Sequence, residues 1–161
     1  VLYPEAVLKE TAKTVDPRDE NVHAVAKAMI QIMRDHRGVG LAAPQVGLCW
    51  RLFVTHDPDD PENAIAWINP ILEVLGDEVA IEEEGCLSIP EVRGNIRRPI
   101  SIRIQGFDIN GDPAEKTSEE MIARVWQHEN DHLDGVLIMD KMTAMDRLIN
   151  RRKIRDLERE K

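Results

Sequence analysis

Apolar residues recur along this chain with two different periods, one helical and one extended. The helical period is clear between residues 21 and 37, where five apolar side chains recur every three or four positions: Val22, Val25, Ala26, Met29 and Met33. This pattern predicts an amphipathic helix near the amino end. Gly38 follows directly and is a natural residue to end the helix.

Two more helices are predicted in the second half of the chain. Around residues 121–134, Met121 and Val125 are followed at helical spacing by two histidines, with a capping-box pattern at residues 117–120 and a glycine at 135. From Thr143 onward, apolar residues alternate with charged ones in a helical pattern: Met145, Leu148, Ile149 and Leu157. The last segment therefore predicts a terminal helix with salt-bridged charges on its surface.

The extended period predicts four strands, at residues 51–55, 66–75, 79–83 and 100–109. In the last of these, Ile100, Ile102 and Ile104 alternate with polar residues, and the strand runs into the hairpin-type turn Asn110-Gly111. The acidic segment 57–63 is predicted to be a surface loop.

Composition and charge restrict the class of protein. A chain of 161 residues with 42% hydrophobic and 32% charged residues fits one globular domain, residues 1–161, and no apolar run is long enough to span a bilayer. The amino end lacks the order of a signal peptide, so the expected location is the cytoplasm. The net charge of −9 argues against broad nucleic-acid binding, but residues 141–161 hold eight basic and four acidic residues. The segment 144–161 is thus predicted to be a basic C-terminal helix.

The two histidines of the second helix, His128 and His132, form an H-E-x-x-H pattern with Glu129. Residues four apart lie on one face of a helix, so both imidazoles can bind one metal ion. Because they continue the apolar face of Met121 and Val125, the metal is expected at the floor of an apolar pocket. Two buried or surface histidines without a metal are the alternative reading.

Two further segments bear on a third metal ligand. Cys86 lies in the stretch EEEGCLSIP, directly after a predicted strand, and Gln45 lies in RGVGLAAPQVG, where small residues allow another backbone to approach closely. Taken singly, Cys86 could be a packing residue like Cys49, and Gln45 an ordinary loop residue. Two cysteines are too few for a disulfide scaffold, and a cysteine near histidines is typical of a metal ligand or a nucleophile.

Together, the three segments carry a family signature. The pattern G-x-G-x-A-A-x-Q is met by residues 38–45, E-G-C-L-S by residues 84–88, and Q-H-E-x-D-H-L-x-G by residues 127–135. The sequence therefore resembles peptide deformylase over nearly its whole length. At the amino end, residues 3–9 lack the second proline and the arginine that are common in that family.

The resemblance implies an α+β fold in which small antiparallel sheets pack around the central H-E-x-x-H helix, between an N-terminal amphipathic helix and a C-terminal helix. It also implies removal of the N-formyl group from N-formylmethionyl nascent polypeptides, with release of formate. A metal-activated water would attack the formyl carbon. Glu129 would act as general base and then acid, with Gln45 and the Leu87 backbone N–H stabilising the oxyanion.

The expected metal ligands are Cys86, His128 and His132, which leave one position open, as in catalytic sites. The resemblance implies one Fe²⁺ per chain, with nickel, cobalt or zinc able to substitute. The residues expected to bind the substrate are Val39, Gly40, Gly85, Met121, Val125 and, by resemblance, Arg93. An ion pair between Arg98 and Asp131 is expected to brace the motif helix, and Arg124 is expected to be a solvated or salt-bridged residue.

Two other functions remain open from the sequence. An H-E-x-x-H zinc peptidase would hydrolyse unformylated peptides and would normally use a third His or Glu ligand. A catalytically silent metal-binding protein would instead dock its basic terminal helix on the ribosome, a contact that some family members also make. That helix fits an ordinary solvated surface equally well. No membrane partner and no specific nucleic acid are expected.

Overall fold

The computed structural model describes residues 1–160 and contains two antiparallel sheets. The larger has the strand order β1-β2-β3-β6-β7, formed by Gly40–Ala42, Leu52–Asp57, Asp60–Val74, Ile102–Phe107 and Pro113–Ser118. The smaller pairs β4 (Val79–Cys86) with β5 (Ile89–Pro99). The expected α+β class is confirmed.

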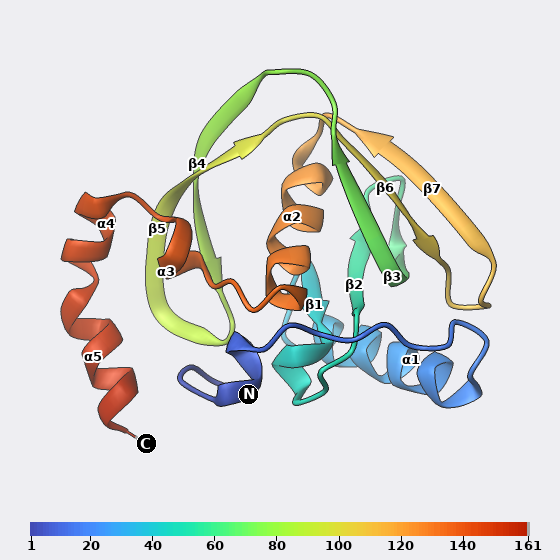
Figure 1. Ribbon diagram of the computed structural model, residues 1–161, viewed down its shortest axis with the longest axis horizontal. Coiled ribbons are helices and arrows are strands. Elements are labelled where there is room, and N and C mark those ends of the chain that lie inside the picture. The colour runs from blue at the N-terminus through green and yellow to red at the C-terminus, as the bar shows by residue number, and fades with distance from the viewer. Residues whose placement is uncertain (161) are drawn as a thin grey trace.

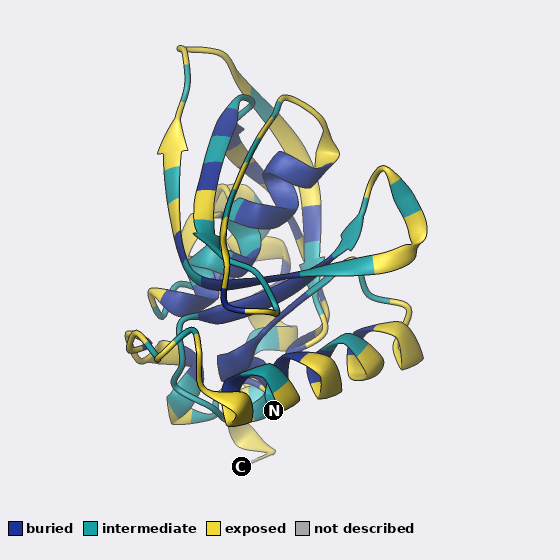
Figure 2. Cartoon of the chain, turned by 90° about the vertical axis from the view of Figure 1, so that its right-hand side faces the viewer, coloured by how far each residue is buried: buried dark blue, intermediate teal, exposed yellow. Residues whose placement is uncertain are grey.

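Helix α2 (Met121–Leu133) runs through the middle of the molecule, with the β4–β5 ribbon on one side and the larger sheet on the other (Figure 1). Helix α1 (Glu20–Asp35) covers the opposite face of the larger sheet. Successive side chains of a strand point to opposite faces, so Phe53 packs with Trp126 of α2, whereas Leu52 and Val54 pack with the apolar face of α1. Most of α2 is consequently buried, while α1 keeps an exposed outer side (Figure 2).

Helix α1 ends differently from the prediction. The left-handed residue after the helix is Arg37 (φ 54°), not Gly38. The Arg37 N–H bonds the Arg34 carbonyl at 3.0 Å and the Gly38 N–H bonds the Met33 carbonyl at 2.9 Å, the two hydrogen bonds of a Schellman motif. The turn places Gly38 and the following strand β1 directly against the helix.

The predicted capping box of α2 is wrong, whereas the predicted end is confirmed. Residues 117 and 118 belong to β7, and the N-cap Glu120 makes no capping bond with its side chain. At the other end Gly135 has φ 73°, and a Cβ there would lie 2.5 Å from the Lys9 carbonyl oxygen, so a side chain has no room. Met121 is 64% exposed, which corrects its assignment to the buried face. It is the first residue of α2 and faces an open cavity.

The four predicted strands are present with shifted ends, but three others were missed. Strand β3 begins at Asp60 and pairs with Asp57 of β2, so the predicted loop 57–63 is a two-residue turn within a hairpin. Strands β1, β5 and β7 were not predicted. Short 3₁₀ helices cover Ala6–Lys9 and Ala43–Val46.

The predicted C-terminal helix is divided into two short helices, α4 (Ala144–Ile149) and α5 (Arg151–Arg159). A further short helix, α3 (Ile138–Lys141), precedes them. Met145, Leu148 and Ile149 are exposed, so this part of the predicted apolar face does not pack inward, whereas Leu157 packs against the core cluster that contains Ile89 and Ile96. Lys161 lies outside the described residues. None of the helices within residues 1–160 is long and apolar enough to cross a membrane.

Helices α4 and α5 lie beside β5 (Figure 1), and polar side chains of these helices and of Asn150, which joins them, bond the outer edge of the strand. Asp146 accepts from the Asn95 N–H at 2.8 Å, and the Asn150 side-chain amide donates to the Arg93 carbonyl at 2.7 Å. Lys153 donates to the Glu91 carbonyl at 3.1 Å. The three contacts fall on every second residue of β5, where an adjacent strand would otherwise bond.

Candidate active site

Three potential metal ligands converge between α2 and the β4–β5 ribbon. The ligand atoms of Cys86, His128 and His132 all lie within 4.8 Å of one another, and Cys86 Sγ is 3.3 Å from His132 Nε2. One thiolate and two imidazoles form a donor set that suits divalent transition metals. With three protein ligands, such a site leaves a position for water or substrate. The residues present therefore fit the metal that the sequence predicts.

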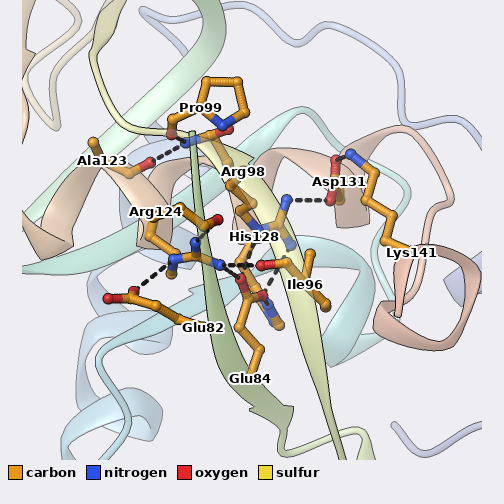
Figure 3. A network of polar contacts seen from close by, with 12 residues as sticks. Glu82, Glu84, Ile96, Arg98, Pro99, Ala123, Arg124, His128, Asp131 and Lys141 are labelled. Carbon is orange, nitrogen blue, oxygen red and sulfur yellow. Dashed lines mark hydrogen bonds and ion pairs between the residues drawn. The ribbon is translucent and has the colours of Figure 1, made fainter. Parts of the chain in front are cut away.

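Glu84 of β4 joins this site to two buried arginines (Figure 3). Its carboxylate accepts from His128 Nδ1 at 2.9 Å, from Arg98 at 2.7 and 2.9 Å, and from Arg124 at 2.5 Å. A histidine with Nδ1 bonded in this way presents Nε2 to a metal. Arg98 also bonds Asp131 at 2.8 Å, which confirms the expected ion pair, and Arg124 is salt-bridged, one of its two expected states.

Several ionisable groups of the site have strongly shifted pKa values. Burial alone would raise the pKa of Glu84, but the hydrogen bonds from His128 and Arg98 hold it well below its usual range. Burial lowers the pKa of His132 to about 3, so this imidazole is neutral and ready to bind a metal. For His128, burial opposes the charge, but bonds to Cys86 and Glu84 outweigh it and raise the pKa to about 10. A metal at this site would displace that proton.

Glu129 is 4% exposed and lies against Gly40 of β1. A Cβ at Gly40 would be 2.6 Å from Glu129 Oε2, so glycine is needed for this approach. Burial raises the pKa of Glu129 to about 7. Among the described residues, its Oε1 has no hydrogen-bond partner, which leaves it free to bond another molecule. A carboxylate in this state can both accept and release a proton near neutral pH.

Gln45 is held in place by the turn that follows β1. Its Oε1 accepts from the Ala42 N–H at 2.9 Å, and its Nε2 is directed toward Ser88 Oγ at 3.2 Å and Cys86 Sγ at 3.5 Å. The side-chain amide thus lies beside the thiolate with a fixed orientation. Leu87, the next residue after Cys86, also lines the cavity, and its side chain is half exposed.

A cavity of about 650 Å³ opens over these groups. It is lined by nearly all of the site residues predicted from the sequence: Val39, Gly40, Gln45, Gly85, Cys86, Leu87, Arg93, Met121, Val125, His128 and Glu129. The exception is His132, which is 2% exposed and lies below the cavity floor. Arg93 is at the rim, where it pairs with Glu83 at 2.6 Å.

Sequence reasoning missed the part that Glu84 plays in this arrangement. Glu84 is the first residue of the pattern E-G-C-L-S, and this was the only indication in the sequence that it belongs to the site. Its partners come from β5 and α2, far away in the sequence. No local spacing predicts that one carboxylate bonds two arginines and a histidine.

The mixed α+β fold and the Cys-His-His group beside a buried glutamate define a metal-binding hydrolase of the H-E-x-x-H type. The sequence model of the polypeptide deformylase family matches residues 1–148. The chain belongs to the peptide deformylase family, which confirms the resemblance and the class of enzyme.

Individual relatives agree with this assignment. The peptide deformylase of Thermotoga maritima is 40% identical over 158 residues, covering 98% of this chain and 94% of the relative. A solved inhibitor complex of Plasmodium falciparum peptide deformylase superimposes with a TM-score of 0.90 at 35% identity, covering 99% and 98% of the two chains. Peptide deformylase 1B of Arabidopsis thaliana, also with an inhibitor, gives a TM-score of 0.92 at 36% identity, covering 99% and 90%.

Proposed function

We propose that this enzyme hydrolyses the N-formyl group of N-formylmethionyl peptides and nascent chains and releases formate. The observation that carries the proposal is the convergence, in one cavity, of Glu129, Gln45 and the Cys-His-His group. Each of these groups has a separate task in the hydrolysis of an amide. The family assignment narrows the amide to a formyl group.

Cys86, His128 and His132 would hold the metal, the histidines through Nε2 because Nδ1 of His128 is bonded to Glu84. When bound, a divalent metal supplies Lewis-acid chemistry that lowers the pKa of a water molecule toward about 7. We propose Fe²⁺ as the native metal, with Ni²⁺, Co²⁺ and Zn²⁺ as substitutes. A thiolate ligand supports the softer transition metals over magnesium or calcium.

Glu129 is proposed to move the protons of the reaction. Its free Oε1 would take a proton from the attacking water as the new C–O bond forms at the formyl carbon. The same carboxyl group would then give that proton to the departing amine nitrogen as the C–N bond breaks. Formate and a free amino terminus result, and Glu129 returns to its starting state.

The developing negative charge on the formyl oxygen needs donors already in place. The Gln45 amide nitrogen and the Leu87 backbone N–H are proposed to supply them. Gln45 is anchored through its other atom by the Ala42 N–H, so its donor does not have to reorganise during the reaction. Leu87 follows Cys86 directly, so the thiolate and this N–H keep a nearly fixed separation.

The cavity also suggests how the peptide is held. Strands β1 and β4 each have an edge without a strand partner, and Gly40 and Gly85 of these strands both line the cavity. An extended peptide could bond between them as an added strand. The methionine side chain would then lie against Val39, Met121 and Val125. A formyl carbon carries only hydrogen, so the narrow site would exclude larger acyl groups.

We further propose that residues 1–161 act as one catalytic domain and that its basic C-terminal helices contact the ribosome. Support comes from a surface groove of α4 and α5 that is lined by four arginines: Arg151, Arg152, Arg155 and Arg159. Such a surface favours the phosphates of nucleic acid. Action on nascent chains would place the enzyme in the cytoplasm, where translation takes place.

Formate release from formyl-Met-Ala-Ser tests the proposed reaction. The protein is loaded anaerobically with Fe²⁺ or Ni²⁺ and compared with Glu129→Ala at equal metal content. Formate release that is lost in the variant supports both the reaction and the role of Glu129. If neither metal gives formate although one ion is bound per chain, the proposal is wrong, and the unformylated peptide becomes the next substrate to assay.

The metal itself needs a separate experiment. Iron beside a thiolate makes Cys86 prone to oxidation, so the purified enzyme should lose activity in air and keep it with a reductant. The nickel-loaded protein is the control for loss through unfolding. Full activity of the purified enzyme after long aerobic storage without a reductant would contradict native iron.

A further inference from the structure

Four charged residues line the mouth of the active-site cavity: Arg37, Glu83, Glu91 and Arg93. They lie on opposite walls. Arg37 ends the turn after α1, next to β1, and the other three belong to the β4–β5 ribbon. If a peptide lies between these walls, its charged side chains meet these groups first.

On the β4–β5 wall, the charges of Glu83 and Arg93 neutralise each other beside Gly85. Glu83 and Arg93 form an ion pair at 2.6 Å, and the Arg93 guanidinium lies across Gly85, where an added Cβ would be 2.5 Å from Nη1. Glu91 is in a bulge between the pairs Gly85–Arg93 and Cys86–Ile89, nearer to the level of the metal ligands. Its carbonyl oxygen accepts from Lys153 of α5.

On the opposite wall, Arg37 carries the charge without a partner. Within residues 1–160, no ion pair or hydrogen bond involves its guanidinium. Its backbone is fixed by the Schellman turn, in contrast to an ordinary flexible loop residue. Neighbouring Arg34 differs, since its side chain bonds the Glu62 carbonyl at 2.8 Å and is not part of the cavity wall.

The peptide residue that would lie nearest to Arg37 can be found by comparing the length of the segment from Arg37 to Gly40 with that of an extended peptide. The reacting formyl group would lie near Gln45 and Glu129, beside Gly40. Arg37 is three residues before Gly40. A bound peptide that is extended advances about 3.3 Å per residue. The chain from Arg37 to Gly40 contains the left-handed turn at Arg37, so it spans at most roughly 10 Å. A peptide antiparallel to β1 would bring its third residue to this distance.

We propose that Arg37 makes the enzyme favour formyl-methionyl peptides with an acidic side chain at the third residue. The inference rests on the proposed deformylase function and adds the class of preferred substrate to it. Arg37 would act on binding, because it lies far from the reacting atoms. Its effect is expected in KM, with kcat nearly unchanged.

The test compares formyl-Met-Ala-Asp-amide with formyl-Met-Ala-Lys-amide, both amidated so that the terminal carboxylate does not contribute a charge. We expect the Asp peptide to have a kcat/KM roughly two- to fivefold higher at low salt, the range of exposed charge pairs. Arg37→Gln should bring the ratio close to one, and Arg37→Glu should reverse it. Arg34→Gln is the matched control, because it removes the same charge from the same end of α1, and it should keep the wild-type ratio.

The outcomes separate this inference from the proposed function. If both peptides are deformylated at equal rates, or if Arg34→Gln changes the ratio as much as Arg37→Gln, the role of Arg37 is overturned and the deformylase function stands. If neither peptide yields formate, the proposed function itself fails. A ratio that falls as salt is raised from about 10 to 500 mM supports an electrostatic origin, and a ratio that is independent of salt counts against Arg37.

Discussion

The Glu84 carboxylate accepts a hydrogen bond from His128 Nδ1 at 2.9 Å, which connects a strand of the small sheet to the motif helix. The same carboxylate bonds Arg98 and Arg124, both of which are buried. The orientation of a metal ligand therefore depends on a buried network of charges. Removing any one charge leaves the others without compensation.

Replacing Glu84 by glutamine should weaken both the metal site and the fold. We expect the metal dissociation constant to rise about 10- to 100-fold, as for other partners of metal-binding histidines. The free energy of unfolding should fall by about 3–5 kcal/mol, because two arginines lose a buried counter-charge. Metal titration and urea denaturation measure the two effects. Glu82→Gln is the control, since Glu82 bonds Arg124 from an exposed position and should cost less than about 1 kcal/mol.

Gly40→Ala tests whether the position of Glu129 matters for the reaction. The new methyl group would lie 2.6 Å from Glu129 Oε2 and must displace the carboxylate. We expect kcat to fall about 100-fold or more, the lower range for loss of a general base, while the metal content stays the same. At Gly38 an added Cβ meets its nearest atom at 3.5 Å, so Gly38→Ala should remain active. Equal activity of the two variants would contradict the importance of the Gly40 contact.

Asn150→Ala tests the contact between α5 and β5. Asn150 is 4% exposed and donates to the Arg93 carbonyl at 2.7 Å. Without this amide a partly buried carbonyl loses its partner, which should lower the free energy of unfolding by about 1 kcal/mol. Arg152→Ala, at an exposed position of α5, should change the free energy of unfolding by less than about 0.5 kcal/mol. Urea denaturation measures the difference between the two variants, through the shift of the midpoint if the slope of the free energy against urea concentration is unchanged.

Asp146 should make the stability of the protein depend on pH under acidic conditions. The Asn95 N–H and then the Thr143 hydroxyl hold the pKa of Asp146 below its ordinary value of 3.8. Because the pKa is lower in the folded state, the stabilisation is present above about pH 4 and is lost as the pH falls through the folded value. The melting temperature of Asp146→Asn should thus be lower than that of wild type at pH 7, and the difference should shrink as the pH falls below about 4. A difference of constant size would show that the charge of Asp146 is not involved.

The motif helix could be predicted because its evidence is local. Two histidines four residues apart, an apolar face and a glycine at position 135 all lie within one short segment. Strand β5 was missed for the opposite reason. Its inward positions include Gly94 and the charged Arg98, so the apolar alternation that predicts a strand is broken. Arg98 is buried only because Glu84 and Asp131 come to it from other elements.

The C-terminal segment shows the limit of the helical pattern itself. The pattern was right about helix and about Leu157, which packs against the core beside β5. It was wrong about the apolar residues of α4, because polar residues make the contacts of this part with the strand. Asp146 and Asn150 face β5, whereas Met145, Leu148 and Ile149 are exposed. Periodicity counts apolar residues and therefore cannot recognise a helix that docks through hydrogen bonds to a strand edge.

Because α4 and α5 dock on β5, the two edges of the β4–β5 ribbon differ. An uncovered strand edge is a template on which other chains can assemble into aggregates. Along β5, the side chains of α4 and α5 occupy the backbone groups without offering a new edge in their place. Along β4, residues 83–86 line the catalytic cavity. We therefore expect the outer side of the ribbon to resist edge-to-edge assembly, whereas its inner edge keeps backbone groups that the proposed extended peptide would bond.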